Sequence, residues 1–377
     1  MDKLQISLFP LLQGKGVPYR IKVIAFMKSL KTTGKICLAG GALWAGLFLA
    51  GCSNPADTST DNSKPDSVAP EAPAVAGPKL TIAEPAEPAI AKPTTEAKKQ
   101  YVIGVSLLKQ DDDFYKALKQ GLMDEGTTEK VSMDIESADL DASKQADQIQ
   151  GFINKKVDAI VICPVDSQAI GTSVTLANNA KIPVFTADIA AKSGSVVCHI
   201  ASDNVEGGRL AGEYAAKLLN GKGNIAILDL KTVTSVQDRV KGFMSAISKY
   251  PGLKVVSDEE VPKAERDKAV DKATNLLTAH PEVNLIFGIN DNVALGTLSA
   301  LQAVKNDKII VIGFDASPEA QIHISSGTSP LKAEAIQFPH LIGITTIDAI
   351  VKSLNGETLP ASIPVPTDLV TKDSFGK

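Results

Sequence analysis

Polar side chains recur in this sequence directly after short apolar runs, at the points where buried strands would end. Carboxylate, amide and guanidinium groups provide planar sets of several hydrogen-bond donors and acceptors. Such groups suit a ligand that carries many hydroxyls. The residues that share this placement are Asp188 after PVFTA, Asn290 after VNLIFGI, Asp315 after KIIVIGF, Gln337 after LKAEAI, and Arg239 in the helical stretch after NIAILDL.

The first apolar run, YVIGVSL (101–107), leads into residues of another kind. It is followed by the polar loop LKQDDD and then by two adjacent aromatic residues, Phe114 and Tyr115. Aromatic rings offer flat apolar faces. Hydrogen bonds around a rim and stacking on the faces are together what a ring-shaped, hydroxyl-rich ligand requires.

Each of these positions also has a purely structural interpretation. An Asp or Asn after a strand often caps the next helix. We expect Asp291, which opens DNVALG, to be the cap there and to leave Asn290 free for a ligand. Phe114 and Tyr115 could belong to the core, and Arg239 could lie on a helix surface. The joint placement of the polar residues at strand ends favours the ligand interpretation.

The elements that must position these residues follow a regular rhythm. From residue 101 onward, short apolar runs alternate with amphipathic stretches of helical period; Phe114, Leu118 and Leu122 share one helical face. This alternation is typical of parallel sheets covered by helices on both faces. The rhythm restarts after residue 204, so we predict an α/β protein with two doubly wound lobes of about five strands each. Ligands bind such sheets outside the carboxyl ends of the strands.

Residues 27–51 have the features of an export signal. A lysine-containing start precedes an apolar run at 36–51 that is too short to span a bilayer comfortably. The run ends in LAGC, which resembles the lipobox of bacterial lipoproteins, in which the cysteine carries the lipid. We therefore predict a lipid anchor on Cys52; a signal anchor or an uncleaved helix with a chance cysteine is the alternative.

Residues 52–99 are rich in proline and alanine and contain no aromatic residue. A segment of this composition buries too little apolar surface to fold, so we expect a disordered tether. Residues 1–26 have no role in this scheme. We interpret them as the result of a start codon placed too far upstream; a genuine extension is the alternative.

Charge and reactive residues narrow the class of function. The net charge of −4 becomes more negative once the basic leader is removed, which argues against nucleic acid as a partner. Cys163 and Cys198 lie in apolar runs, so we expect them to be buried as free thiols; a disulfide, which export would permit, is the alternative. The cysteines and histidines have no metal-ligand spacing, and no P-loop is present, so we expect no metal, no cofactor and no enzymatic activity.

Four runs, HIASDNVEGG, NLLTAHPEV, NDNVALG and VIGFDASPE, resemble the periplasmic sugar-binding proteins of the ribose-binding type. These are the solute-binding components of bacterial ABC importers, and the resemblance covers residues 101–377. It implies a type I periplasmic binding protein fold, with two Rossmann-like lobes joined by three crossovers near 201–204, at Gln337 and in PVPTDLV. The implied lobes are residues 100–202 with 338–365, and residues 203–337 with 366–377.

The resemblance also implies roles and partners. The expected ligand is a monosaccharide, the expected partners are ABC permease subunits, and the protein is a monomer in the periplasm or cell envelope. In the family, an aromatic pair stacks on the sugar, and polar residues at strand ends bind its hydroxyls. The positions that match, together with the residue two before the aromatic pair, are Asp112, Phe114, Tyr115, Asp188, Arg239, Asn290, Asp315 and Gln337.

Some matched positions depart from ribose binders. Ile189 stands where they have an arginine, Asp112 replaces an asparagine, Ala264 replaces an aromatic residue and Leu108 replaces a serine. A charge-assisted hydrogen bond contributes about 1.5–3 kcal/mol, against about −8 kcal/mol for micromolar binding. The ligand could therefore be a ribose-like pentose or another aldose or ketose.

Three other functions would use a similar chain. A sugar sensor that presents its ligand to a chemoreceptor or histidine kinase would have the same site. A regulator of the lactose-repressor type would need an N-terminal helix-turn-helix, where this chain has a signal sequence and a tether. An enzyme would need reactive groups in a catalytic arrangement, which the sequence does not indicate.

Overall fold

The computed structural model describes residues 78–85 and 90–376. The predicted signal at 27–51, the predicted lipid site Cys52 and most of the predicted tether lie outside the described residues. Within the described part, no helix has both the length and the apolar character needed to cross a bilayer.

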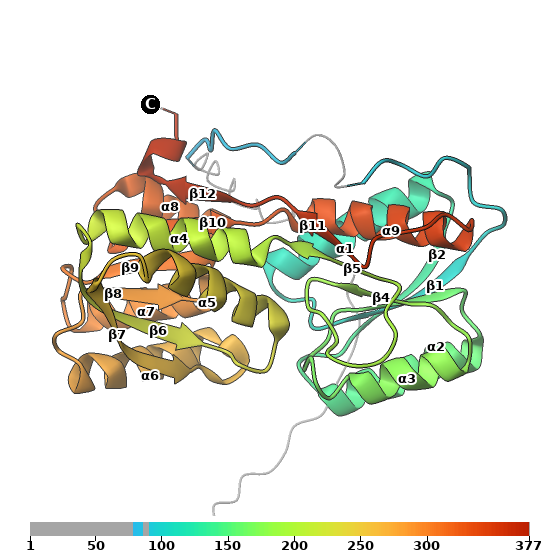
Figure 1. The fold of residues 1–377 in the computed structure, drawn as a ribbon, viewed down its shortest axis with the longest axis horizontal. Coiled ribbons are helices and arrows are strands. Elements are labelled where there is room, and N and C mark those ends of the chain that lie inside the picture. The colour runs from blue at the N-terminus through green and yellow to red at the C-terminus, as the bar shows by residue number, and fades with distance from the viewer. Residues whose placement is uncertain (1–77, 86–89, 377) are drawn as a thin grey trace, which may run out of the picture. The chain divides into compact units, whose positions relative to one another are not determined.

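The first sheet has six parallel strands in the order β11-β5-β4-β3-β1-β2. Helices α1 and α9 pack together against it, and α2 and α3 lie on its other face (Figure 1). The strands are β1 (Val102–Leu107), β2 (Ser132–Ser137), β3 (Ala159–Ile162), β4 (Val184–Ala187), β5 (Cys198–Ser202) and β11 (Ser362–Val365). The helices are α1 (Asp113–Thr128), α2 (Ala142–Lys155), α3 (Gly171–Asn179) and α9 (Pro339–Leu354).

The second sheet also has six strands, in the order β12-β10-β9-β8-β6-β7, of which only β12 is antiparallel to its neighbour. Helices α4 and α5 pack as one pair and α6 and α7 as another. The strands are β6 (Lys222–Asp229), β7 (Gly252–Glu260), β8 (Leu285–Gly288), β9 (Ile310–Asp315), β10 (Leu331–Ile336) and β12 (Asp368–Thr371). The helices are α4 (Asn204–Leu218), α5 (Thr234–Ile247), α6 (Arg266–Ala279), α7 (Asp291–Ala303) and α8 (Pro318–Ser326), with short 3₁₀ turns η1 (Pro262–Ala264) and η2 (Lys372–Ser374).

The core lies on both faces of each sheet. Every residue of β3, β4 and β8 is buried, because helices cover these central strands from both sides. The stacked rings of Phe243 and Phe287, with centroids 4.3 Å apart, join α5 to β8. Cys163 and Cys198 are buried free thiols. The predicted α/β architecture of two doubly wound lobes is confirmed.

The chain passes between the two sheets three times, after β5, after β10 and between β11 and β12. The sequence predicted about five strands per lobe, and the structure has six. The additional strands β11 and β12 come from the stretch SIPVPTDLVT near the C-terminus, and each completes a different sheet. This stretch reads as a crossover in the sequence, since two short strands separated by two residues leave little pattern.

The segment before β1 lies against the folded unit (Figure 1). Leu80 forms an isolated bridge with Phe375, and Thr81 N–H donates to the carbonyl of Ser374 at 2.8 Å. Farther along, the Asn355 amide donates to the carbonyl of Thr95 at 2.9 Å. We expected a disordered tether up to residue 99, but its described part is in contact with the folded unit. Leu80, Ile82 and Ile90 pack against the core, although the segment's overall composition is that of a linker.

Candidate ligand-binding site

A cavity of about 470 Å³ lies where the carboxyl ends of the two sheets face each other. A second cavity, of about 660 Å³, shares several residues with it, so the two belong to one cleft. The first cavity is lined by every residue that the sequence singled out as a ligand contact: Asp112, Phe114, Tyr115, Asp188, Arg239, Asn290, Asp315 and Gln337.

Asp188 follows β4 directly and is held by its neighbours. Its backbone has φ of +65°, a left-handed conformation that Asp adopts more readily than most residues. The Tyr115 hydroxyl donates to Asp188 Oδ2 at 2.6 Å. Burial raises the pKa of Asp188 to about 6, while the Tyr115 hydrogen bond and the Arg239 charge act in the opposite direction. The result is a fixed, largely desolvated acceptor at the lip of the first sheet.

The aromatic pair divides its roles. The Tyr115 ring is buried and is fixed by its hydrogen bond to Asp188. Phe114 is half-buried, meets the Tyr115 ring edge-on at 5.2 Å, and lines both cavities. The ring of Phe114 is therefore the more accessible of the two for stacking on a ligand.

Arg239 is buried rather than exposed on its helix. Its Nε donates to Asn204 Oδ1 at 2.8 Å, and its Nη1 donates to the Ile289 carbonyl at 2.8 Å. The guanidinium also lies over the ring of Phe314, 4.0 Å from the centroid. A long side chain held at several points in this way presents a pre-positioned donor to the cavity.

Asp315 is the counterpart of Asp188 in the second lobe. It ends β9 with φ of +102°, and its Oδ1 lies 3.4 Å from Arg239 Nη1. The Gln337 amide also donates to Asp315 Oδ1, while Gln337 Oε1 has no partner among the described residues. Burial raises the pKa of Asp315 to about 7, and the Arg239 charge opposes this shift.

The structure corrects the expected cap of α7. Asn290 Oδ1 accepts from Val293 N–H at 2.9 Å, so Asn290 is the N-cap, and the prediction that Asp291 has this role was wrong. The Asp291 carboxylate instead accepts from Ser317 N–H at 3.0 Å. The cap uses only the amide oxygen of Asn290, and the residue still lines both cavities.

Asp112 combines the same two placements. Its Oδ1 caps α1 by accepting from Tyr115 N–H at 2.9 Å, and its Oδ2 pairs with Lys109 Nζ at 2.6 Å. Capping and cavity lining are therefore not exclusive interpretations, because a cap at a strand end already points its side chain toward the cleft.

A buried acid beside Asp315 was not singled out from the sequence. Glu334 in β10 is fully buried, and its Oε2 accepts from Ala316 N–H at 2.8 Å, directly after Asp315. Burial and the nearby Asp291 carboxyl raise the pKa of Glu334 well above its usual range. Glu334 therefore supports the turn that carries Asp315. A charged residue inside the apolar run LKAEAI was the available signal.

Direct contacts between the lobes were also missed. Thr234 N–H at the start of α5 donates to Ser167 Oγ at 3.1 Å, and Ala190 N–H donates to Thr234 Oγ1 at 2.9 Å. Ser167 N–H donates to the Thr232 carbonyl at 3.2 Å. The N-cap position of α5 is Val233, whose side chain cannot cap, so a serine of the other lobe provides an acceptor for this helix end.

The positions that depart from ribose binders lie together. Leu108, Ile189 and Ala264 all line the first cavity, beside Val233 and Val236. Ile189 is only 4% exposed. The cavity thus has an apolar wall next to the polar set, and a change at one of these positions would alter the surface that a ligand meets.

Two doubly wound lobes with a polar cavity between the carboxyl ends of their sheets define a class of two-lobed binding proteins. The chain belongs to the periplasmic binding protein family, since the model described as a periplasmic binding protein domain matches residues 103–358. It is 34% identical over 277 residues to the ribose import binding protein of Salmonella typhimurium (strain LT2), which covers 73% of this chain and 92% of the relative.

Solved structures agree with this membership. One is an ABC transporter solute binding protein from Bacillus halodurans C-125 with bound myo-inositol, with a TM-score of 0.68, 30% identity, and coverage of 74% of this chain and 97% of that chain. Another is the fructose binding periplasmic domain of a hybrid two component system, with a TM-score of 0.68, 29% identity, and coverage of 73% and 91%. The resemblance to the sugar-binding family is confirmed.

Proposed function

We propose that this chain is the solute-binding subunit of a bacterial ABC importer and captures a monosaccharide between its two lobes. One observation carries the proposal: polar residues from strand ends of both sheets, with an accessible aromatic ring, converge on a single cavity. The relatives that bind sugars and related polyols support the same class of ligand. The chain acts by binding rather than by catalysis.

Binding follows from the geometry of the cleft. Asp188 and Asp315 accept hydrogen bonds from ligand hydroxyls, while Arg239, Asn290 and Gln337 donate to them. The ring of Phe114 covers one face of the sugar. Because these groups belong to both lobes, a ligand that contacts all of them favours the closed arrangement, in which Ser167 meets Thr234.

The ligand is a pentose, or another aldose or ketose, with an apolar surface that faces Ile189. An isoleucine cannot donate the hydrogen bonds of the arginine found there in ribose binders, and Leu108 and Ala264 extend the same apolar wall. We therefore propose a monosaccharide of this class as the ligand and do not assign ribose.

The protein works as a monomer in the periplasm or cell envelope. A lipid on Cys52 holds it at a membrane, and the tether places the binding unit within reach of the ABC permease subunits. The basic leader, the apolar run and the LAGC box support this arrangement.

A ligand screen tests the proposal. Ligand that binds the native state raises thermal stability by mass action, so one or a few monosaccharides should raise the unfolding temperature. The panel contains pentoses, hexoses, ketoses, polyols and nucleosides. If none of them shifts the transition, the sugar-receptor proposal fails.

Two variants then test the site. Asp188→Ala or Arg239→Ala should weaken binding of the identified sugar at least about tenfold, because each removes a charged hydrogen-bonding group. Calorimetry measures the affinity, and Asp147→Ala, at an exposed position of α2, is the control. An unchanged affinity in either variant would remove that residue from the site.

A second candidate is a sensor that presents its sugar to a chemoreceptor or histidine kinase. The similarity to the fructose binding domain of a two component system favours it. Deleting the gene separates the two: an import subunit is needed for uptake of labelled sugar, whereas a sensor is needed for the response to the sugar while uptake continues.

A further inference from the structure

Three carboxylates meet where α1 packs against α9, away from the cleft. Glu125 lies in the last turn of α1, Glu129 is its C-cap residue, and Asp348 comes from the middle of α9. The ligand atoms of the three side chains all lie within 4.8 Å of one another. Glu125 and Glu129 are only four residues apart, but Asp348 is more than 200 residues away, and the group includes no histidine or cysteine, so sequence motifs did not reveal it.

Asp348 is the most buried of the three acids. Its residue is fully buried, and neither of its carboxylate oxygens has a hydrogen-bond partner among the described residues. A buried carboxylate without a partner is strongly unfavourable, so such groups are normally paired or coordinate a metal. The Glu125 carboxyl lies close to Asp348, and two neighbouring carboxylates repel each other unless a proton or a cation lies between them.

The surrounding charges do not balance the three acids. Lys92, from the segment before β1, pairs with Glu125 at 2.8 Å, but its side chain is 53% exposed. The last turn of α1 contains no basic residue, and the carboxyl end of a helix carries a partial negative charge of its own. A cation at this position would therefore gain from both the side chains and the helix.

We propose that Glu125, Glu129 and Asp348 form a binding site for a divalent metal ion of the calcium class. Carboxylate oxygens are the ligands that hard cations such as Ca²⁺ prefer, and water completes the coordination shell. The site stands independently of the sugar site, since Tyr115 and Glu125 lie near opposite ends of α1.

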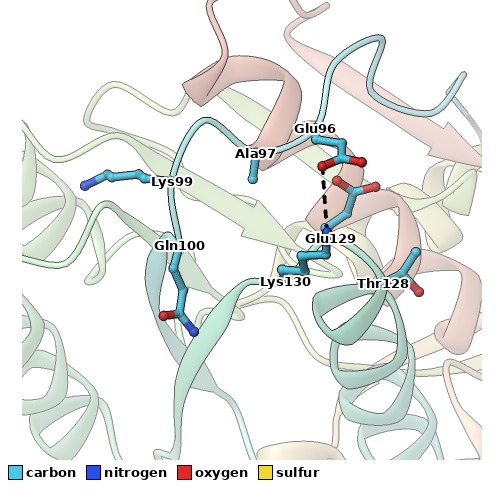
Figure 2. Close-up of a pocket in the computed structure, with 7 residues that line it drawn as sticks. All are labelled: Glu96, Ala97, Lys99, Gln100, Thr128, Glu129 and Lys130. Atoms are coloured by element: carbon cyan, nitrogen blue, oxygen red, sulfur yellow. Dashed lines mark ion pairs between the residues drawn. The ribbon is translucent and has the colours of Figure 1, made fainter.

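An ion can reach the site from the side of Glu129. This residue is half-buried and lines a pocket of about 650 Å³ together with Glu96 and Lys130 (Figure 2). Glu96 and Lys130 form an ion pair at 3.7 Å across this pocket. Lys92 competes with the ion for Glu125, so the ammonium group must move aside when the metal binds.

Calorimetric titration of chelator-treated protein with CaCl₂ tests the proposal, with MgCl₂ and MnCl₂ titrated separately. We expect one Ca²⁺ per chain with a Kd of roughly 10⁻⁴–10⁻³ M, the range of extracellular calcium modules, and a higher unfolding temperature when calcium is present. Asp348→Asn and Glu129→Gln should each weaken binding at least about tenfold. Lys92→Met should tighten it, because the competing ammonium group is gone.

One control and the choice of a partly exposed ligand keep the test decisive. Asp147→Asn, at an exposed carboxylate of α2, should bind calcium as the unchanged protein does. Glu129→Gln changes a partly exposed group, so the site can still be tested if Asp348→Asn does not fold. The proposal is overturned if none of the three cations binds, which would mean that the three acids share a proton instead. It is also overturned if Asp348→Asn and Glu129→Gln both bind calcium as tightly as the unchanged protein.

Discussion

Asp188 and Asp315 are placed alike in the two lobes. Each ends a parallel strand, has a positive φ, and points a largely desolvated carboxylate into the cleft. Left-handed backbone and buried charge both reduce stability, and such features gather at functional sites. The strand-end aspartates are therefore residues at which binding and stability are in conflict.

Replacing Asp188 by Asn should expose this conflict. The pKa of Asp188 is about 6 in the folded protein, above the ordinary value of 3.8, so the native state binds the proton more tightly than the unfolded state does. The stabilisation that protonated Asp188 contributes to the native state is complete below pH about 4 and is lost as the pH rises through about 6. At pH 7 the ligand-free Asp188→Asn protein should be up to about 3 kcal/mol more stable than the unchanged protein.

Urea unfolding of ligand-free protein between pH 4 and 8 measures this difference. It should shrink as the pH falls and be small near pH 4, where Asp188 is protonated in the native state and close to half protonated in the unfolded state. Asp113→Asn, at an exposed carboxylate of α1, controls for the loss of one negative charge. A difference that does not change with pH would contradict the assigned cause.

Among the elements, α5 is capped at its start by a residue of the other lobe, so its capping depends on whether the two lobes are closed. Its first N–H is satisfied by Ser167 of the other lobe, and its first hydroxyl, on Thr234, accepts from Ala190 N–H. If the lobes separate, these groups lose their inter-lobe hydrogen bonds and must form hydrogen bonds with water instead. The hydrogen bonds at the start of α5 thus stabilise the closed arrangement of the two lobes without contacting the ligand.

Ser167→Ala should therefore weaken ligand binding without changing any residue of the polar set. It leaves the Thr234 N–H without its acceptor in the closed state, at a cost of about 1–2 kcal/mol, or about tenfold in affinity. The loss should appear mainly as faster sugar dissociation, measured by stopped-flow fluorescence. Ser143→Ala, on the exposed surface of α2, is the control; an unchanged dissociation rate in Ser167→Ala would show that this contact does not favour closure.

At the scale of the whole molecule, the repeating pattern determined what could be predicted. Alternating buried strands and amphipathic helices predicted two doubly wound lobes, and the carboxyl ends of the strands predicted where the polar residues meet. The confirmed fold follows from period and composition, which are local properties of the sequence.

The remainder depended on contacts between distant residues. Asn290 caps α7 while the Asp291 carboxylate accepts a hydrogen bond from the distant Ser317 N–H. The hydrogen bond between Thr234 N–H and Ser167 Oγ joins residues of different lobes. Leu80 packs because Phe375 lies beside it. None of these partners is a sequence neighbour, so no local pattern predicts them.

Truncation tests the contribution of the segment before β1. A chain that starts at residue 100 loses the packing of Leu80, Ile82 and Ile90 against the core. We expect it to be less stable than a chain that starts at residue 78 by about 3 kcal/mol, with an unfolding temperature lower by about 5 °C. Calorimetry on both ligand-free chains measures the difference, and equal unfolding temperatures would mean that the segment only rests on the surface.

The three passages of the chain between the sheets also govern the order of assembly during synthesis. Strand β11 is part of the first sheet and helix α9 packs on that sheet and on α1, yet both are the last parts of this lobe to leave the ribosome. Until they emerge, β5 lacks its neighbour and α1 lacks the helix that covers it. The N-terminal lobe therefore cannot finish folding until almost the whole chain has been synthesised, whereas separate domains usually fold one after the other.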